Sequence, residues 1–296
     1  MTVRFLRDPM SLAGLGVILL VFVLTMAAPL LSPHDPLPVS LAERLQPAGN
    51  DYPLGTDPLG RCLLSRLLFG GRMTLQYSLS VLLIIILIGV PAGLAAGYLG
   101  GIVDSILMRM ADIVLAFPNL ILALVVTGVL GPGLINILIA LALVSWVQYA
   151  RVVRGMVLSL KEKEFILAAR ASGTAPGGII WHHLLPNVLP PVAVMATLNL
   201  GSLVLSISTL SFLGLGAQPP LPEWGAMINE ARNYIVTQPQ LMLYPGTAIA
   251  VTVLGFNLLG DGLRDVFDPQ GFTRPRAYGF GKGKQPVFVA GAKRIN

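Results

Sequence analysis

Residues 73–103 read MTLQYSLSVLLIIILIGVPAGLAAGYLGGIV and contain no Lys, Arg, Asp or Glu. A membrane-spanning helix needs about 20 consecutive, mostly apolar residues, so this run is long enough to cross a bilayer. Over the whole chain, 54% of the residues are hydrophobic and only 11% are charged. A soluble domain carries about 25% charged residues, so the sequence predicts an all-α, polytopic membrane protein. Four further runs lack all four charged residue types, namely 9–34, 113–150, 171–222 and 233–260.

Glycine and proline divide these runs into six predicted spans. Pro118 predicts a kink inside the third span, because proline cannot donate a helical hydrogen bond. Gly131-Pro132-Gly133 predicts the turn that follows it. Arg4 and Arg7 precede the first span as they would in a signal peptide, but that run is long enough to span and more spans follow. The expected spans are Leu12–Leu31, Thr74–Tyr98, Ser105–Leu130, Leu134–Val157, Leu189–Leu213 and Leu241–Leu259.

The distribution of Lys and Arg predicts which side of the membrane holds the two ends. Six spans place both ends on one side, and Lys and Arg accumulate on the cytoplasmic side. With both ends cytoplasmic, that side carries 15 of the 20 Lys and Arg residues. Both termini are therefore predicted to be cytoplasmic, and the net charge of +6 is interpreted as topological rather than as a sign of nucleic-acid binding. The five on the outer side are Arg44, Arg61, Arg66, Arg72 and Arg232.

Three segments outside the spans complete the expected organisation. Residues 32–72 form a predicted extracytoplasmic segment. Its arginines between Arg61 and Arg72 are an exception to the rule that Lys and Arg accumulate on the cytoplasmic side, although Asp51 and Asp57 lie nearby. Residues 158–188 form a predicted cytoplasmic loop between spans four and five. The basic tail, residues 271–296, is expected to be disordered.

The chain lacks the motifs of an enzyme or a metal protein. It has no glycine-rich phosphate loop that ends in Gly-Lys-Ser/Thr, so we do not expect it to hydrolyse ATP by itself. No HExxH or CxxC motif occurs, and three histidines support no Ser/His/Asp set. His182 and His183 are adjacent, and neighbours on a helix point about 100° apart, so they form a poor chelate. We therefore predict no catalytic residue, no metal site and no cofactor bound by this chain.

Three charged residues lie where the third span is expected to begin. Arg109 and Asp112 are spaced i, i+3 and can pair on a helix, with Asp104 one turn earlier. We interpret this group as a neutralised anchor at the membrane interface; an ion relay is the alternative. An ion-coupled carrier normally needs a charge near the bilayer centre, and the spans show none. The energy source is therefore expected outside this chain.

The interval between spans four and five carries the most informative pattern. A charged, helix-forming stretch begins at Glu164 and ends at Gly173, which suits a helix C-terminus in the left-handed conformation or a close backbone approach. A second short helix is expected to follow, and Pro186 is expected to end it. Ala168 and Ala169 provide a small-residue face for another protein. From the residues alone, a docking helix pair and an ordinary amphipathic interfacial helix remain equally open.

This interval resembles the EAA loop of permease subunits of ABC importers. Ala168, Ala169, Gly173, Leu185 and Pro186 match the pattern of that loop. Leu167 stands where the loop usually has glutamate, and Glu164 precedes it by three positions.

Other motifs resemble the dipeptide/oligopeptide/nickel branch of the same family, over about residues 10–270. The branch usually has aspartate after Gly-Arg, where this chain has Cys62. The matching segments are Leu54-Gly55-Thr56-Asp57 with Gly60-Arg61, Ser65-Arg66-Leu67, Asp112 with Ala116-Phe117-Pro118, Tyr149-Ala150-Arg151 with Val153-Arg154, Ser211-Phe212-Leu213-Gly214-Leu215-Gly216, Glu223-Trp224-Gly225 with Met227-Ile228, and Asn257-Leu258-Leu259-Gly260-Asp261 with Leu263-Arg264-Asp265 and Asp268-Pro269.

The resemblance implies a permease domain at 1–270 that forms half of a translocation path for short peptides. Nickel or a metal chelate is the alternative cargo, and a stand-alone channel or a membrane scaffold is the alternative class. The implied partners are a homologous permease subunit, two ATPase subunits that use ATP and Mg, and an extracytoplasmic binding protein. The resemblance also implies an inner-membrane location.

The resemblance implies two contact sites on this chain. The expected ATPase contact comprises Glu164, Ala168, Ala169, Gly173, Leu185 and Pro186. Glu223 and Trp224 are the expected contact with the binding protein, and an interfacial aromatic anchor is the alternative for Trp224.

Overall fold

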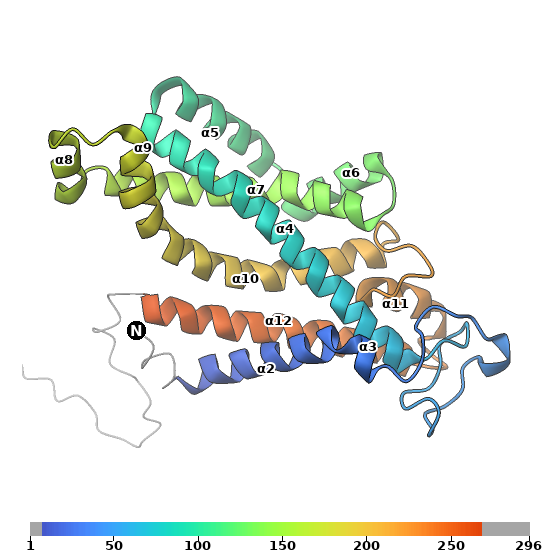
Figure 1. The fold of residues 1–296 in the computed structure, drawn as a ribbon. Coiled ribbons are helices and arrows are strands. Elements are labelled where there is room, and N and C mark those ends of the chain that lie inside the picture. Colours follow the sequence, from blue (N-terminus) through green and yellow to red (C-terminus); the bar gives the residue numbers. More distant parts are fainter. Residues whose placement is uncertain (1–7, 268–296) are drawn as a thin grey trace, which may run out of the picture.

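The computed structural model describes residues 8–267, and within that range every regular element is helical (Figure 1). An isolated antiparallel bridge joins Thr56 and Cys62. The expected tail at 271–296 lies outside the described residues. The helices are α2 (Pro9–Met26), α3 (Ala28–Leu31), α4 (Leu63–Leu99), α5 (Gly101–Leu115), α6 (Asn119–Leu130), α7 (Leu134–Leu160), α8 (Glu164–Ala171), α9 (Pro176–Ile179), α10 (Leu185–Phe212), α11 (Trp224–Ala231) and α12 (Gln240–Phe267).

Five of these helices are long and apolar enough to cross a membrane. They are α2, α4, α7, α12 and the helix that runs from Pro176 through α10 to Phe212. A sixth crossing results if α5 and α6 count as one span. The prediction of an all-helical, multi-span membrane protein is therefore confirmed, with five or six spans.

The third span is bent much more sharply than the predicted kink. Helices α5 and α6 meet at 90°, and residues 116–118 separate them. Pro118 is the N-cap of α6, with an extended ψ of 126°. A residue that precedes proline avoids the helical backbone conformation. Phe117 precedes Pro118, so α5 ends before the proline and α6 begins in another direction.

Helix α4 begins earlier than the sequence suggested. Its first residue is Leu63, so the last ten residues of the predicted extracytoplasmic segment, 63–72, are helical. Arg66 lies in this first part of the helix, and its side chain is buried and paired with Asp57 and Glu230.

Glycines allow α4 and α7 to pack against each other at very short distance. A Cβ atom on Gly93 would lie 2.5 Å from the carbonyl oxygen of Ala150, and one on Gly97 would lie 2.7 Å from the Cβ of Val157. Gly89 faces Trp146 and Tyr149 in the same way. Glycine at every fourth position lets two membrane helices approach until their backbones nearly touch.

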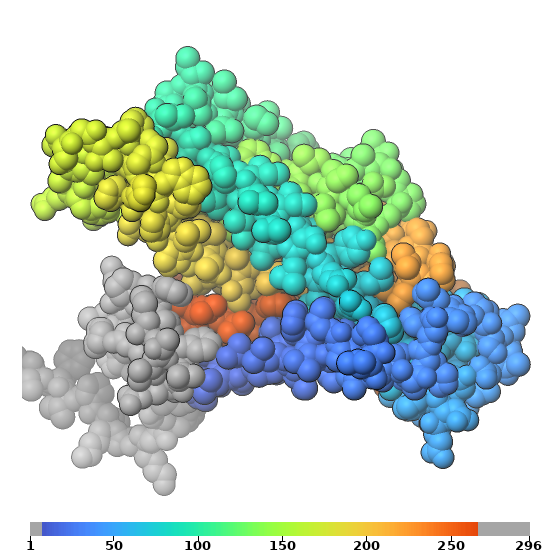
Figure 2. Space-filling view, viewed as in Figure 1, coloured from blue at the N-terminus to red at the C-terminus, as the bar shows by residue number. Residues whose placement is uncertain are grey.

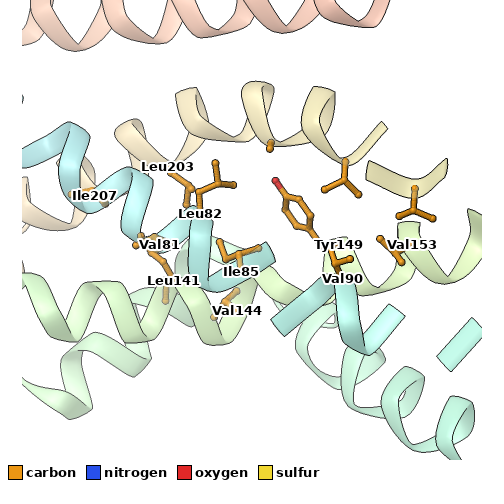
Figure 3. Packing of buried hydrophobic residues seen from close by; sticks show 14 of the residues in the cluster. Val81, Leu82, Ile85, Val90, Leu141, Val144, Tyr149, Val153, Leu203 and Ile207 are labelled. Carbon is orange, nitrogen blue, oxygen red and sulfur yellow. The ribbon is translucent and has the colours of Figure 1, made fainter. Parts of the chain in front are cut away.

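The main core fills the space between α4, α7 and α10 (Figure 3). The hydroxyl of Tyr149 points toward α10 from this core and has no hydrogen-bond partner within residues 8–267. The side chains that meet in Figure 3 include Val81, Leu82, Ile85, Leu141, Val144, Leu203 and Ile207.

Helix α2 packs along α12 beside this core (Figure 1). A Cβ atom on Gly14 would lie 2.6 Å from the backbone nitrogen of Leu259, and one on Gly262 would lie 1.8 Å from the Oγ of Ser11. The start of α2, the end of α12 and the helices α8 and α9 lie at one end of the bundle, whereas α3, α11 and the segment before α4 lie at the other (Figure 1). This arrangement gives the molecule two distinct ends.

Candidate functional site

The first candidate site is the docking segment, defined as residues 164–186. Helix α8 ends at Ala171, and Gly173 follows with φ of +78°. The Gly173 N–H donates to the carbonyl of Arg170, and the Thr174 N–H donates to that of Ala169. This pair of bonds is the Schellman arrangement, which uses a left-handed glycine to end a helix. A Cβ on Gly173 would meet no atom within 4 Å, so the backbone conformation, and not crowding, favours glycine here.

The second half of the docking segment is continuous with a membrane span. Pro186 was expected to end a short helix, but the structure runs without interruption from Pro176 to Phe212. A π-helical turn at Ile180–Leu184 precedes the proline, and the Leu185 N–H donates to the carbonyl of Ile180. The wider turn accommodates Pro186, which has no N–H to donate and would clash with a carbonyl in a regular helix. Leu185 and Pro186 therefore lie inside one long helix.

Buried apolar side chains and ring contacts hold the docking segment in place. Ile166, Ile179 and Leu184 are almost completely buried against the bundle. The Arg170 guanidinium lies 5.4 Å from the centroid of the Tyr98 ring, which ties α8 to the end of α4. These contacts make the segment a fixed lobe rather than a free loop.

The outer side of this lobe exposes large apolar side chains. Phe165, Leu167 and Trp181 are 44%, 50% and 68% exposed, and the segment stands out from one end of the molecule (Figure 2). Glu164 and Ala168 are also exposed, whereas Ala169 is half-buried. A rigid lobe with exposed apolar residues is suited to packing into a groove on another protein.

A buried ion network lies at the opposite end of the bundle. Arg61 contacts Asp57 through Nε at 2.6 Å and Glu230 through Nη2 at 2.6 Å. Arg66 contacts Glu230 through Nη2 at 2.9 Å and Asp57 through Nε at 3.3 Å. Two cations and two anions therefore balance, and the network joins the start of α4 to α11.

This network explains why arginines occur in the predicted extracytoplasmic segment, against the rule that Lys and Arg accumulate on the cytoplasmic side. Two of its arginines are neutralised by carboxylates, so they add no net charge to that end. The sequence placed Asp57 close to these arginines, but it did not indicate Glu230 as a partner, because Glu230 lies more than 150 residues further along the chain. Cys62 is buried beside the network, at the N-cap of α4.

Glu223 and Trp224 fix α11 against α4 instead of facing outward. Glu223 is fully buried, and its carboxylate accepts hydrogen bonds from the Ala226 N–H at 2.9 Å and the Thr74 hydroxyl at 3.0 Å. Burial raises the pKa of Glu223, and the backbone N–H groups of Ala226 and Gly225 oppose this shift. Trp224 is 2% exposed and donates from Nε1 to the carbonyl of Leu67. Both side chains are therefore buried within this chain, and their expected contact with a binding protein stays a prediction.

The charged residues at the start of the third span pair with α7. Asp112 lies 2.5 Å from Nη2 of Arg151, and Asp104 lies 2.6 Å from Nη2 of Arg154. The expected pair of Arg109 with Asp112 is therefore replaced by a pair between helices. The anchor interpretation fits better than a relay, because each acid is matched by one arginine at the same end as the docking segment.

Comparison with known proteins identifies the class to which this arrangement belongs. Residues 89–270 match the family described as binding-protein-dependent transport system inner membrane component, and residues 1–48 match the N-terminal TM domain of oligopeptide transport permease C. The fold resembles that of the methionine ABC transporter MetNI in an inward-facing conformation, with a TM-score of 0.51 and 24% identity, over 69% of this chain and 97% of that one. This likeness concerns the fold alone.

Three curated relatives match nearly the whole chain. The dipeptide transport system permease protein DppC of Alkalihalophilus pseudofirmus is 42% identical over 264 residues, which cover 89% of this chain and 87% of the relative. The nickel transport system permease protein NikC of Escherichia coli is 44% identical, over 80% of this chain and 86% of the relative. The glutathione transport system permease protein GsiD of Pectobacterium atrosepticum is 41% identical, over 90% and 89%.

These findings define a multi-pass component of a transport system in the inner membrane. The chain belongs to the binding-protein-dependent transport system inner membrane component family, as a permease subunit of an ABC importer. Its relatives are permease subunits and not enzymes. The resemblance drawn from the sequence motifs is thereby confirmed.

Proposed function

We propose that this chain forms half of the translocation path of an ATP-driven importer for short peptides. A related permease subunit would complete the path, two ATPase subunits would supply the energy from ATP and Mg, and a binding protein would deliver the cargo. The relatives named for dipeptide, D,D-dipeptide and glutathione transport, each at least 40% identical, support peptide cargo.

We propose the 1–270 region as the permease domain, with both termini and the docking segment on the cytoplasmic side. The excess of Lys and Arg supports this orientation, since 15 of 20 fall on that side. The start of α2, the end of α12 and α8 also lie together at one end of the bundle, as six alternating crossings require (Figure 1).

The unbroken helix from Pro176 to Phe212 is the observation that carries the proposed coupling mechanism. An ATPase that closes on ATP moves the lobe that packs into it, and a stiff connection is needed to pass that motion to the path. The helical residues continue from the lobe into a span without an intervening loop, so displacement of the lobe is passed to the span. In this mechanism Glu164, Ala168 and Ala169 contribute surface, Gly173 sets the turn, and Leu185 and Pro186 lie on the connecting helix.

The alternative cargo is nickel or a metal chelate, which the 44% identity to NikC supports. The complete importer, reconstituted with its binding protein in vesicles that contain ATP, separates the two. We expect uptake of a labelled dipeptide that excess unlabelled dipeptide abolishes and Ni²⁺ leaves unchanged. Uptake of ⁶³Ni²⁺ without peptide uptake would replace the peptide assignment by nickel.

A further inference from the structure

A cavity of the described chain opens at the end opposite the docking segment. Its volume is about 680 Å³, which falls in the range of small-molecule sites, about 300–1,000 Å³. One wall is a single face of α4, with residues at i, i+3, i+4 and i+7. The chain that follows α3 forms the facing wall. The α4 residues are Phe69, Arg72, Met73 and Gln76.

The facing wall is held in place by specific contacts. The His34 ring stacks on Tyr52, with 4.7 Å between the ring centroids. The His34 N–H donates to the Ser65 hydroxyl on α4 at 3.3 Å, so the wall is fixed to the helix across the cavity. The cavity therefore has a defined shape.

Arg72 differs from the other arginines near the start of α4. Arg61 and Arg66 are both neutralised by Asp57 and Glu230. Arg72 is half-buried and lines the cavity, and within residues 8–267 no carboxylate lies within ion-pair distance of it. A guanidinium that is partly desolvated without a counter-ion binds a carboxylate favourably, because two parallel N–H groups match two carboxylate oxygens.

The rest of the lining suits a small zwitterion with apolar side chains. Asp35 lines the same cavity, and among the described residues its carboxylate accepts only a local hydrogen bond, from the Leu37 N–H at 2.9 Å. Phe69, Met73 and Leu221 supply apolar surface. One cation and one anion that are not paired with each other line the same cavity as these apolar side chains, and they match the two charged termini of a short peptide.

We propose that this outer cavity binds short peptides by their C-terminal carboxylate through Arg72 before they enter the translocation path. The inference rests on the proposed peptide import and adds a binding residue to it. Asp35 provides the matching charge for the α-ammonium group. The site lies in the permease itself, so its preference is separate from that of the binding protein.

A binding measurement without the binding protein tests this site directly. The complete importer in nanodiscs is titrated with dialanine and with dialanine amide, and saturation-transfer NMR reports binding. We expect the wild type to bind the free acid about ten times more tightly than the amide, since the amide lacks the charge-assisted bond. Arg72→Gln should remove that preference and leave amide binding unchanged, and Arg72→Lys should retain part of it.

Arg232→Gln is the matched control, because Arg232 is an exposed arginine at the same end and lies outside the cavity lining. It should bind both peptides like the wild type. An equal loss of both peptides in Arg72→Gln, or no loss, would overturn the carboxylate site. Vesicle uptake by the wild-type importer is measured in parallel. Absence of peptide uptake there would reject the proposed function itself, whatever the binding result.

Discussion

Gly173 fixes the direction in which the chain leaves α8. Its φ of +78° lies in the left-handed region, where a β-branched side chain is strained by about 1–3 kcal/mol. The surrounding space is open, so a substitution there perturbs the turn without a steric clash elsewhere.

The first prediction at the residue scale is that Gly173→Val weakens ATPase docking while the subunit still inserts and pairs. The strained turn should tilt α8 away from its position and lower uptake in proportion to lost docking. Co-purification of the ATPase subunits with the mutant complex, beside transport, measures both effects. Ser172→Ala, one residue away and exposed, should be close to neutral. Full docking and uptake in Gly173→Val would remove the docking segment from the mechanism.

The second prediction at the residue scale concerns how folding stability changes with pH, and its direction follows from the burial of Glu223. Because its pKa is raised, the folded chain keeps a proton that the unfolded chain has already released, so stability falls as pH rises above the ordinary carboxyl range. Thermal melting of the wild type and of Glu223→Gln between about pH 5 and about pH 8 isolates this contribution. We expect the wild type to lose more stability than the variant as pH rises. Parallel curves would show that Glu223 does not titrate in this window.

At the scale of elements, the contact between α4 and α7 depends on the missing side chains of three glycines. A new side chain at the centre of this contact cannot fit unless the two helices separate, because the nearest atom is a backbone oxygen at 2.5 Å. Overpacking of this kind costs about 1–3 kcal/mol and more where backbone must move.

We therefore predict that Gly93→Val lowers the melting temperature of the purified complex and its yield in the membrane. Gly128→Val is the matched control, since Gly128 is also a helical glycine but a Cβ there meets nothing within 4 Å. The control should retain wild-type yield and melting. Equal behaviour of the two variants would mean that α4 and α7 are not packed as closely as described.

At the scale of the whole molecule, the two ends of the bundle have different surfaces and are expected on different sides of the membrane. Asp51 and Ser172 are both exposed, and the native Cys62 is buried. Asp51 belongs to the segment before α4 and Ser172 follows α8, and these segments lie at opposite ends of the bundle (Figure 1). Labelling of cysteines introduced at these positions can therefore be measured with little labelling of the native Cys62.

We predict that Asp51→Cys reacts with a membrane-impermeant maleimide added from outside, and that Ser172→Cys reacts only after the membrane is permeabilised. A reporter fused at Asn296 should agree with Ser172→Cys. The unmodified chain controls for labelling of Cys62. Labelling of both cysteines from outside would contradict the topology.

The sequence alone was sufficient for features that depend on neighbouring residues. Long charge-free runs predicted the membrane helices, since a helix crosses the bilayer wherever enough apolar residues follow one another. Gly173 was identified as the end of α8, because a left-handed turn is a local property of the backbone. The motifs around the docking segment were enough to indicate the family.

Only the tertiary structure decided features that depend on contacts between distant segments. Pro186 ends a helix in a local pattern, but the preceding π turn carries the helix past it. Arg66 looked like a loop residue until Asp57 and Glu230 neutralised it, and Glu223 looked exposed until α4 supplied Thr74 as its partner. Whether a charge faces solvent or a counter-ion is set by which helices pack together, and a sequence pattern with a period of a few residues carries no information about a partner more than a hundred residues away.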